Sequence, residues 1–295
     1  MGRAGETRGH QRNPQARLSM PEIPRKAHRT YMRPSQGEMD ALLDVMYHHK
    51  MNNAQFNIKL RVSIPSTSFG IIPSDILEDI LIGMAKENNE SLDNLSEYSG
   101  CFKNPKVIEI VFLLSEFWCQ DSATKYQAVE ILNRFMILHI KVLYESNVKS
   151  MKIQRASQTK KWSSIKDDLC DTFLLHLVSC IQIASKLHFH CHIINNNMVL
   201  QFLQSAGYKY RKSDLLKSEL TVLRTLHFNV NLLSPFNYVD ILLEVLGHNG
   251  CPLSLEQLRG MCLKVMDFVY LTRNSIYEIL LKMSIDHPTP SSLQR

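Results

Sequence analysis

Residues 173–186 read FLLHLVSCIQIASK, and this stretch decides the fold class of the 295-residue chain. Its apolar side chains would cover nearly the whole circumference of a helix rather than a single face. A helix that is apolar all round belongs in the middle of a bundle, where other helices surround it. We therefore predict a central helix over residues 169–187.

The segments on both sides of this helix have the periodicity of amphipathic helices, with apolar residues at intervals of three and four. Helices are predicted over residues 38–52, from about residue 74, and over 106–119, 122–143, 198–205, 213–226, 235–246 and 255–283. In the segment 213–226 we expect five leucines to face the core: Leu215, Leu216, Leu220, Leu223 and Leu226. No alternation typical of strands is present, so the predicted fold class is all-α.

Composition divides the chain into four parts. Residues 1–36 contain almost no large apolar residues and are predicted to be a disordered basic tail. Residues 37–103 form a helical extension, in which the polar stretch 87–100 is expected to be a loop. Residues 104–233 form the main domain, which ends before Ser234-Pro235 because the residue before a proline avoids the α region. Residues 234–295 form a shorter last part.

The net charge of +6 comes entirely from the first 34 residues, which hold eight basic and two acidic side chains. The other residues carry equal numbers of basic and acidic side chains. A nucleic-acid-binding groove would need its positive charge on the folded body. We therefore expect the protein to contact nucleic acid only indirectly or through the tail 1–34. The tail itself is either a solvated segment without a partner or an arm that serves nuclear import or binds nucleic acid.

A polar segment, residues 145–168, separates two of the predicted helices and is interpreted as a loop insertion. A long loop within a compact domain is usually either disordered or functional. Lys160, Lys161 and Trp162 are the candidate contact residues if it binds a partner, because tryptophan is enriched in binding hot spots.

Neither a catalytic site nor a cofactor site is predicted. His188, His190, Cys191 and His192 form the one ligand-rich cluster, but neighbouring residues point in different directions and a zinc site draws its ligands from separated pairs. No phosphate loop, nucleophile elbow or dinucleotide fingerprint is present. Seven cysteines without a CxxC pair fit a reducing compartment. No apolar run is long enough to span a bilayer, so we expect no membrane association.

Four short motifs occur in order along the main domain. They are AVEILNRF at residues 128–135, IASK at 183–186, LKSELTVL at 216–223, and LHFNV at 226–230 followed by Ser234-Pro235. Together with the predicted helix order they resemble the cyclin box over about residues 105–235. The resemblance implies a five-helix cyclin box followed by a truncated or degenerate second cyclin-like repeat.

The resemblance also implies a partner-binding pair. In cyclins, a lysine of the third helix and a glutamate of the fifth hold the regulatory helix of a kinase, and the matching residues here are Lys186 and Glu219. These side chains can form charge-assisted bonds with a partner. The alternative is that they only pair with each other at the surface, where an ion pair adds little stability.

Within the cyclin family, the chain most resembles the branch linked to meiotic crossover formation. This implies a nuclear, non-catalytic protein-binding subunit that acts in meiotic recombination through a cyclin-dependent kinase. Leu187-His188-Phe189-His190 stands where cyclins carry an acidic pair after the IASK motif, which favours the alternative of a kinase-independent scaffold for recombination proteins. A nucleic-acid-binding factor built from cyclin-like repeats is a third possibility, and the uncharged body argues against it.

Overall fold

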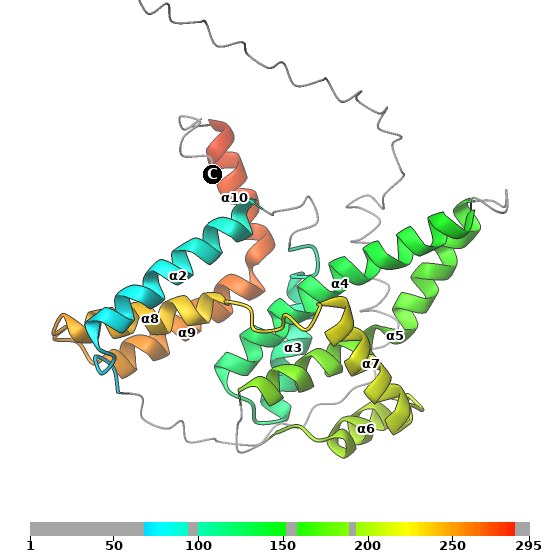
Figure 1. Ribbon diagram of the computed structural model, residues 1–295, viewed down its shortest axis with the longest axis horizontal. Helices are drawn as coiled ribbons and strands as arrows, with labels where there is room; N and C mark the ends of the chain where they lie inside the picture. Colours follow the sequence, from blue (N-terminus) through cyan, green and yellow to red (C-terminus); the bar gives the residue numbers. More distant parts are fainter. Residues whose placement is uncertain (1–67, 94–99, 152–157, 189–192, 287–295) are drawn as a thin grey trace, which may run out of the picture. The chain divides into compact units, whose positions relative to one another are not determined.

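The computed structural model describes residues 68–93, 100–151, 158–188 and 193–286 of the chain (Figure 1). In these residues all regular structure is helical, which confirms the all-α fold class. The helices are α2 (Ser74–Asp93), α3 (Pro105–Phe117), α4 (Ser122–Met151), α5 (Gln158–Leu187), α6 (Asn196–Ser205), α7 (Lys212–Thr225), α8 (Pro235–His248), α9 (Leu255–Leu271) and α10 (Arg273–Asp286). The tail 1–36 and the predicted helix 38–52 lie outside the described residues.

Helix α5 is the central helix, as predicted. Every residue from Phe173 to Ser185 is buried, and α3, α4 and α7 all contact this helix. Figure 1 shows α4 and α5 running side by side. The part Ile165–Leu187 is long and apolar enough to cross a membrane by length and composition, but 78% of its apolar 18-residue window is buried inside the protein. Its position at the centre of the bundle accounts for its apolar character.

Two predicted loops are wrong in part, because most of one and the first half of the other are helical. Helix α4 continues to Met151 and α5 begins at Gln158, so most of the supposed insertion 145–168 extends these two helices. Helix α2 likewise continues to Asp93, into the supposed loop 87–100. Polar residues such as Lys, Gln and Glu are good helix formers, and neither 145–168 nor 87–93 contains a Gly or Pro that would stop a helix.

The predicted single helix over residues 255–283 is also wrong, because it consists of α9 and α10. The break is at Thr272, whose hydroxyl donates a hydrogen bond of 2.7 Å to the carbonyl of Phe268, four residues earlier. Such a bond from a threonine to its own helix often bends the helix. The apolar periodicity continues across this position, so it gave no sign of the break.

The prediction for the leucines of α7 is partly wrong. Leu215 and Leu226 are buried, but Leu216 is 46% exposed and Leu220 is 39% exposed. Helix α7 packs mainly on α5 and needs only a narrow apolar stripe for this contact. Leu223 packs against the core, and Leu216 and Leu220 form an apolar surface on the outside of the bundle.

Two tyrosines join the main domain to the helices that follow it. The Tyr126 hydroxyl of α4 donates a hydrogen bond of 2.7 Å to Asp267 of α9, and the Tyr270 hydroxyl of α9 donates one of 3.0 Å to Glu130 of α4. Burial, reinforced by the Asp267 carboxylate, raises the pKa of Tyr126, so its hydroxyl remains a donor at neutral pH. Lys125 also binds Asp267, at 2.6 Å. These reciprocal contacts hold α9 against α4.

The segment before α2 is clamped to α8 through its backbone. The buried carboxylate of Glu244 accepts hydrogen bonds from the amides of Ile71 and Ile72, both at 2.6 Å, and from the amide of Gly70. Burial alone would raise the pKa of Glu244, but these amides and the nearby His248 outweigh it, so the pKa is lowered. The carboxylate is therefore ionised at neutral pH and remains an acceptor.

This clamp requires glycine at residue 247. A Cβ atom added to Gly247 would lie 2.7 Å from the backbone nitrogen of Gly70, so one of the two backbones would have to move. We expect Gly247→Ala to lower the free energy of unfolding by about 1–3 kcal/mol, measured by urea denaturation. The matched control is Gly260→Ala in α9, where nothing lies within 4 Å of the added Cβ. Helix propensity should make that control neutral or stabilising, and equal destabilisation by both variants would contradict the clamp.

Candidate partner-binding site

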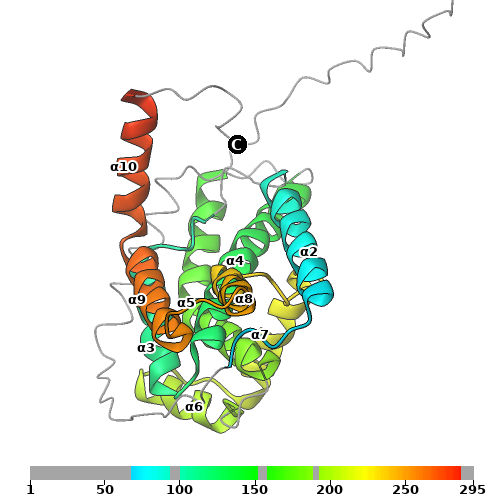
Figure 2. The same cartoon turned by 90° about the vertical axis from the view of Figure 1, so that its left-hand side faces the viewer.

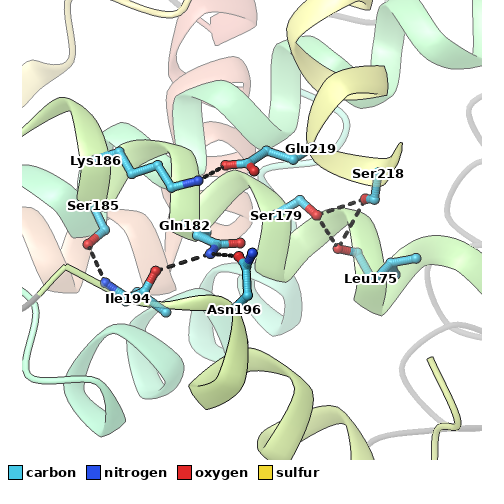
Figure 3. Close-up of polar contacts among 9 residues, drawn as sticks. All are labelled: Leu175, Ser179, Gln182, Ser185, Lys186, Ile194, Asn196, Ser218 and Glu219. Carbon is cyan, nitrogen blue, oxygen red and sulfur yellow. Dashed lines mark hydrogen bonds and ion pairs between the residues drawn. The ribbon is translucent and has the colours of Figure 1, made fainter. Parts of the chain in front are cut away.

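Lys186 and Glu219, which are 33 residues apart in the sequence, form an ion pair. Lys186 lies in the last turn of α5 and Glu219 in the middle of α7, as Figure 3 shows. The Glu219 side chain is only 11% exposed, whereas the Lys186 side chain is 44% exposed. The glutamate is thus held in place by the bundle, and the lysine presents part of its charge to the surface.

Buried hydroxyl groups fix α7 against α5 beside the glutamate. Ser218 and Ser179 share a hydrogen bond of 2.7 Å, and Ser218 shares another of 2.9 Å with His176. Ser179 also donates to the carbonyl of Leu175 at 2.8 Å (Figure 3). Because Ser218 precedes Glu219, this network sets the position from which the carboxylate projects.

A second set of hydrogen bonds fixes the end of α5 beside the lysine. The Gln182 amide donates to the carbonyl of Ile194 at 3.1 Å and to the side chain of Asn196 at 2.7 Å. The Ser185 hydroxyl accepts from the amide of Ile194 at 3.2 Å. Figure 3 shows these residues next to the ion pair. The chain that leads into α6 is therefore tied to the last turns of α5, and Lys186 projects from a rigid support.

Exposed apolar side chains accompany the ion pair. Leu216 and Leu220 lie three residues before and one residue after Glu219, which places all three on one face of α7. Just beyond α7, Phe228 is 64% exposed and has a φ of 59°. Its amide donates to the carbonyl of Leu223, so its left-handed backbone belongs to the turn that ends α7. We define Lys186, Leu216, Glu219 and Leu220 as the α5–α7 surface.

Sequence reasoning found only part of this surface. The family resemblance identified Lys186 and Glu219, whereas Leu216 and Leu220 were expected in the core. The spacing of the leucines carried the missing signal, because apolar residues cover more of α7 than one buried stripe needs.

Comparison with known proteins adds two relatives. The chain is 41% identical over 233 residues to the mouse (Mus musculus) protein named cyclin N-terminal domain-containing protein 1. It is 44% identical over 233 residues to the human (Homo sapiens) protein of the same name. In both cases the match covers 79% of this chain and 70% of the relative. The chain belongs to the cyclin N-terminal domain-containing protein 1 family.

Membership of this family confirms the cyclin-like character of the fold. No protein-family model matches the chain, and no solved structure matches it.

The other candidate contact residues lie far from the α5–α7 surface in this family member. Lys160, Lys161 and Trp162 belong to the start of α5, and their side chains lie outside the described part of the chain. Lys186 lies 24 residues beyond Trp162 on the same helix. This separation corresponds to about 36 Å at the rise of an α-helix. A partner-binding role for these three residues remains a prediction, on a helix rather than a loop.

The described residues contain no group of three or more His, Cys, Asp or Glu side chains that could hold a metal ion. His188 follows α5 in a turn, whereas His190, Cys191 and His192 fall in the segment 189–192, outside the described ranges. The predicted absence of a metal at this cluster is therefore not tested.

Two histidines behind the ion pair make the fold of this family member sensitive to acid. Burial and the neighbouring His139 lower the pKa of His176 from 6.5 to about 4. Burial also lowers the pKa of His139, whose ring centre lies 5.3 Å from that of His176. The unfolded chain therefore takes up these protons more readily than the folded protein. The stability from a neutral His176 is complete above pH 6.5 and is lost as the pH falls to about 4.

We expect acidification across this window to remove roughly 3 kcal/mol of unfolding free energy through His176 alone. Urea denaturation at pH 7.5 and at pH 4.5 measures the loss. Glutamine at residue 176 keeps a hydrogen-bonding side chain that does not titrate, so His176→Gln should show a smaller loss between the two pH values. An equal loss in both proteins would contradict the assignment to His176.

Proposed function

We propose that the chain is a non-catalytic protein-binding subunit that acts in meiotic crossover maturation, in the nucleus, through a cyclin-dependent kinase. The observation that carries the proposal is the α5–α7 surface, where a rigidly supported and half-exposed Lys186 lies beside exposed leucines. Apolar side chains around a charged pair can exclude water when a partner binds, which strengthens the polar contacts at the centre.

The ion pair suits recognition of a partner's loop or helix. Lys186 offers three donors, and its pairing with Glu219 uses only part of that capacity. Glu219 is nearly buried, so it can restrain the direction of the lysine stem. A partner carbonyl or carboxylate can then bind an ammonium group that is already oriented, which reduces the entropy lost on binding.

A second candidate function is that of a scaffold for recombination proteins without kinase activity. It is favoured by the sequence Leu187-His188-Phe189-His190 after Lys186, which replaces the acidic pair of cyclins. The scaffold would keep the cyclin-like fold but would not bind a kinase through the α5–α7 surface. In both versions, nucleic acid is reached indirectly or through the basic tail 1–34.

The proposal is tested by affinity purification from germ-line tissue, with mass spectrometry and a kinase assay on each eluate. The wild-type chain is compared with the double variant Lys186→Glu, Glu219→Lys, which reverses the two charges but keeps them opposite to each other. Recovery of a cyclin-dependent kinase and its activity with the wild type alone supports the kinase role. Recovery of the same recombination proteins with both, and no kinase with either, supports the scaffold.

A further inference from the structure

Helix α9 has two apolar faces on opposite sides, and only one of them is covered. Met266 and Tyr270 are buried towards the main domain. Met261, Val265 and Phe268 lie on the other side of the helix and are 59%, 61% and 62% exposed. A helix at the surface of a protein normally turns polar residues to solvent. The second apolar face of α9 therefore has the character of a contact surface.

Helix α10 continues this apolar surface. It extends from the end of α9, which is its main neighbour (Figure 2). Five large apolar side chains are each more than half exposed: Tyr277, Ile279, Leu280, Leu281 and Met283. They cover more than half of the helix circumference, whereas the similarly apolar α5 is enclosed by three other helices. No such cover lies over α10 among the residues that the structure describes.

We propose that this α9–α10 face is the dimer interface of the chain, and that a second copy of the same chain covers it. Eight apolar side chains on the face are each more than half exposed. Together they offer on the order of 800 Å², which is what one partner contributes to a stable interface of standard size. The available area is thus sufficient for a dimer.

The chemistry of the face suits a copy of itself. On α10 the exposed Glu278 and Lys282 carry opposite charges, so this part of two identical faces does not repel itself. Met261, Val265 and Phe268 follow each other at intervals of four and three, the spacing by which two helices pack along a common seam. A twofold axis brings the same apolar patch of both copies together. A membrane surface or nucleic acid would instead call for an excess of positive charge.

Sedimentation velocity of the full chain over a range of micromolar concentrations tests this proposal. The wild type is expected to sediment as a dimer with twice the monomer mass of 34.0 kDa. The variant Val265→Glu, Phe268→Glu should be monomeric, with a dissociation constant raised at least about 100-fold. Both residues are exposed, so the thermal unfolding midpoint of the monomer should change little.

A matched control and a second variant complete the design. Leu216→Glu, Leu220→Glu alters an exposed apolar pair on α7 and should leave the dimer intact while it weakens the proposed partner binding. Tyr277→Glu, Leu280→Glu provides an independent disruption from α10. A wild-type chain that stays monomeric at every concentration overturns the proposal. A dimer that neither the α9 nor the α10 variant weakens overturns it as well.

Discussion

Lys186→Glu is expected to weaken the proposed complex with a cyclin-dependent kinase by about 2–5 kcal/mol, which is at least a 30-fold rise in the dissociation constant. The substitution places a carboxylate beside the nearly buried carboxylate of Glu219, so both the internal pair and the donor offered to the kinase are lost. Isothermal titration calorimetry with the purified kinase measures the change.

The double variant Lys186→Glu, Glu219→Lys is the control for the fold. It restores an internal pair of opposite charges but offers the partner the wrong charge at the exposed residue. Because the nearly buried residue 219 keeps a partner of opposite charge, the thermal midpoint of the double variant should lie closer to that of the wild type than the midpoint of Lys186→Glu does. If the double variant binds the kinase as tightly as the wild type, the pair has no role in binding.

Leu177→Ala is expected to lower the free energy of unfolding by about 2–5 kcal/mol. Leu177 is fully buried on α5, at 0% exposed, so the substitution leaves a cavity in the centre of the bundle. Leu216→Ala makes the same chemical change at a side chain that is 46% exposed, and it should alter stability by no more than about 0.5 kcal/mol. Urea denaturation of the three proteins measures both effects, and a comparable loss in Leu216→Ala would contradict the orientation of α7.

Local patterns predicted the helices that depend on burial. Residues 173–186 are apolar on all sides because other helices surround them, and this pattern correctly indicated the central helix α5. The polar ends of α2, α4 and α5 were missed, because a helix that projects into solvent shows no apolar stripe. The absence of Gly and Pro from residues 145–168 was the one available signal for the helices there.

Contacts between distant residues could not be derived from periodicity. Lys186 and Glu219 were brought together in advance only by the resemblance to cyclins. The clamp of Glu244 on the amides of Ile71 and Ile72 has no sequence signature, because any residue except proline presents the same backbone amide. Leu216 and Leu220 face solvent because of the way α7 is rotated about its axis against α5. The sequence of α7 alone does not determine this rotation.

Hydrogen–deuterium exchange of the chain, free and bound to its co-purified partner, tests the central claim most directly. Partner binding at the α5–α7 surface predicts slower exchange at the end of α5 and along α7. The helices α9 and α10 should keep the same exchange rates in both states. Protection confined to other parts of the chain, with unchanged exchange around Lys186 and Glu219, would contradict the account.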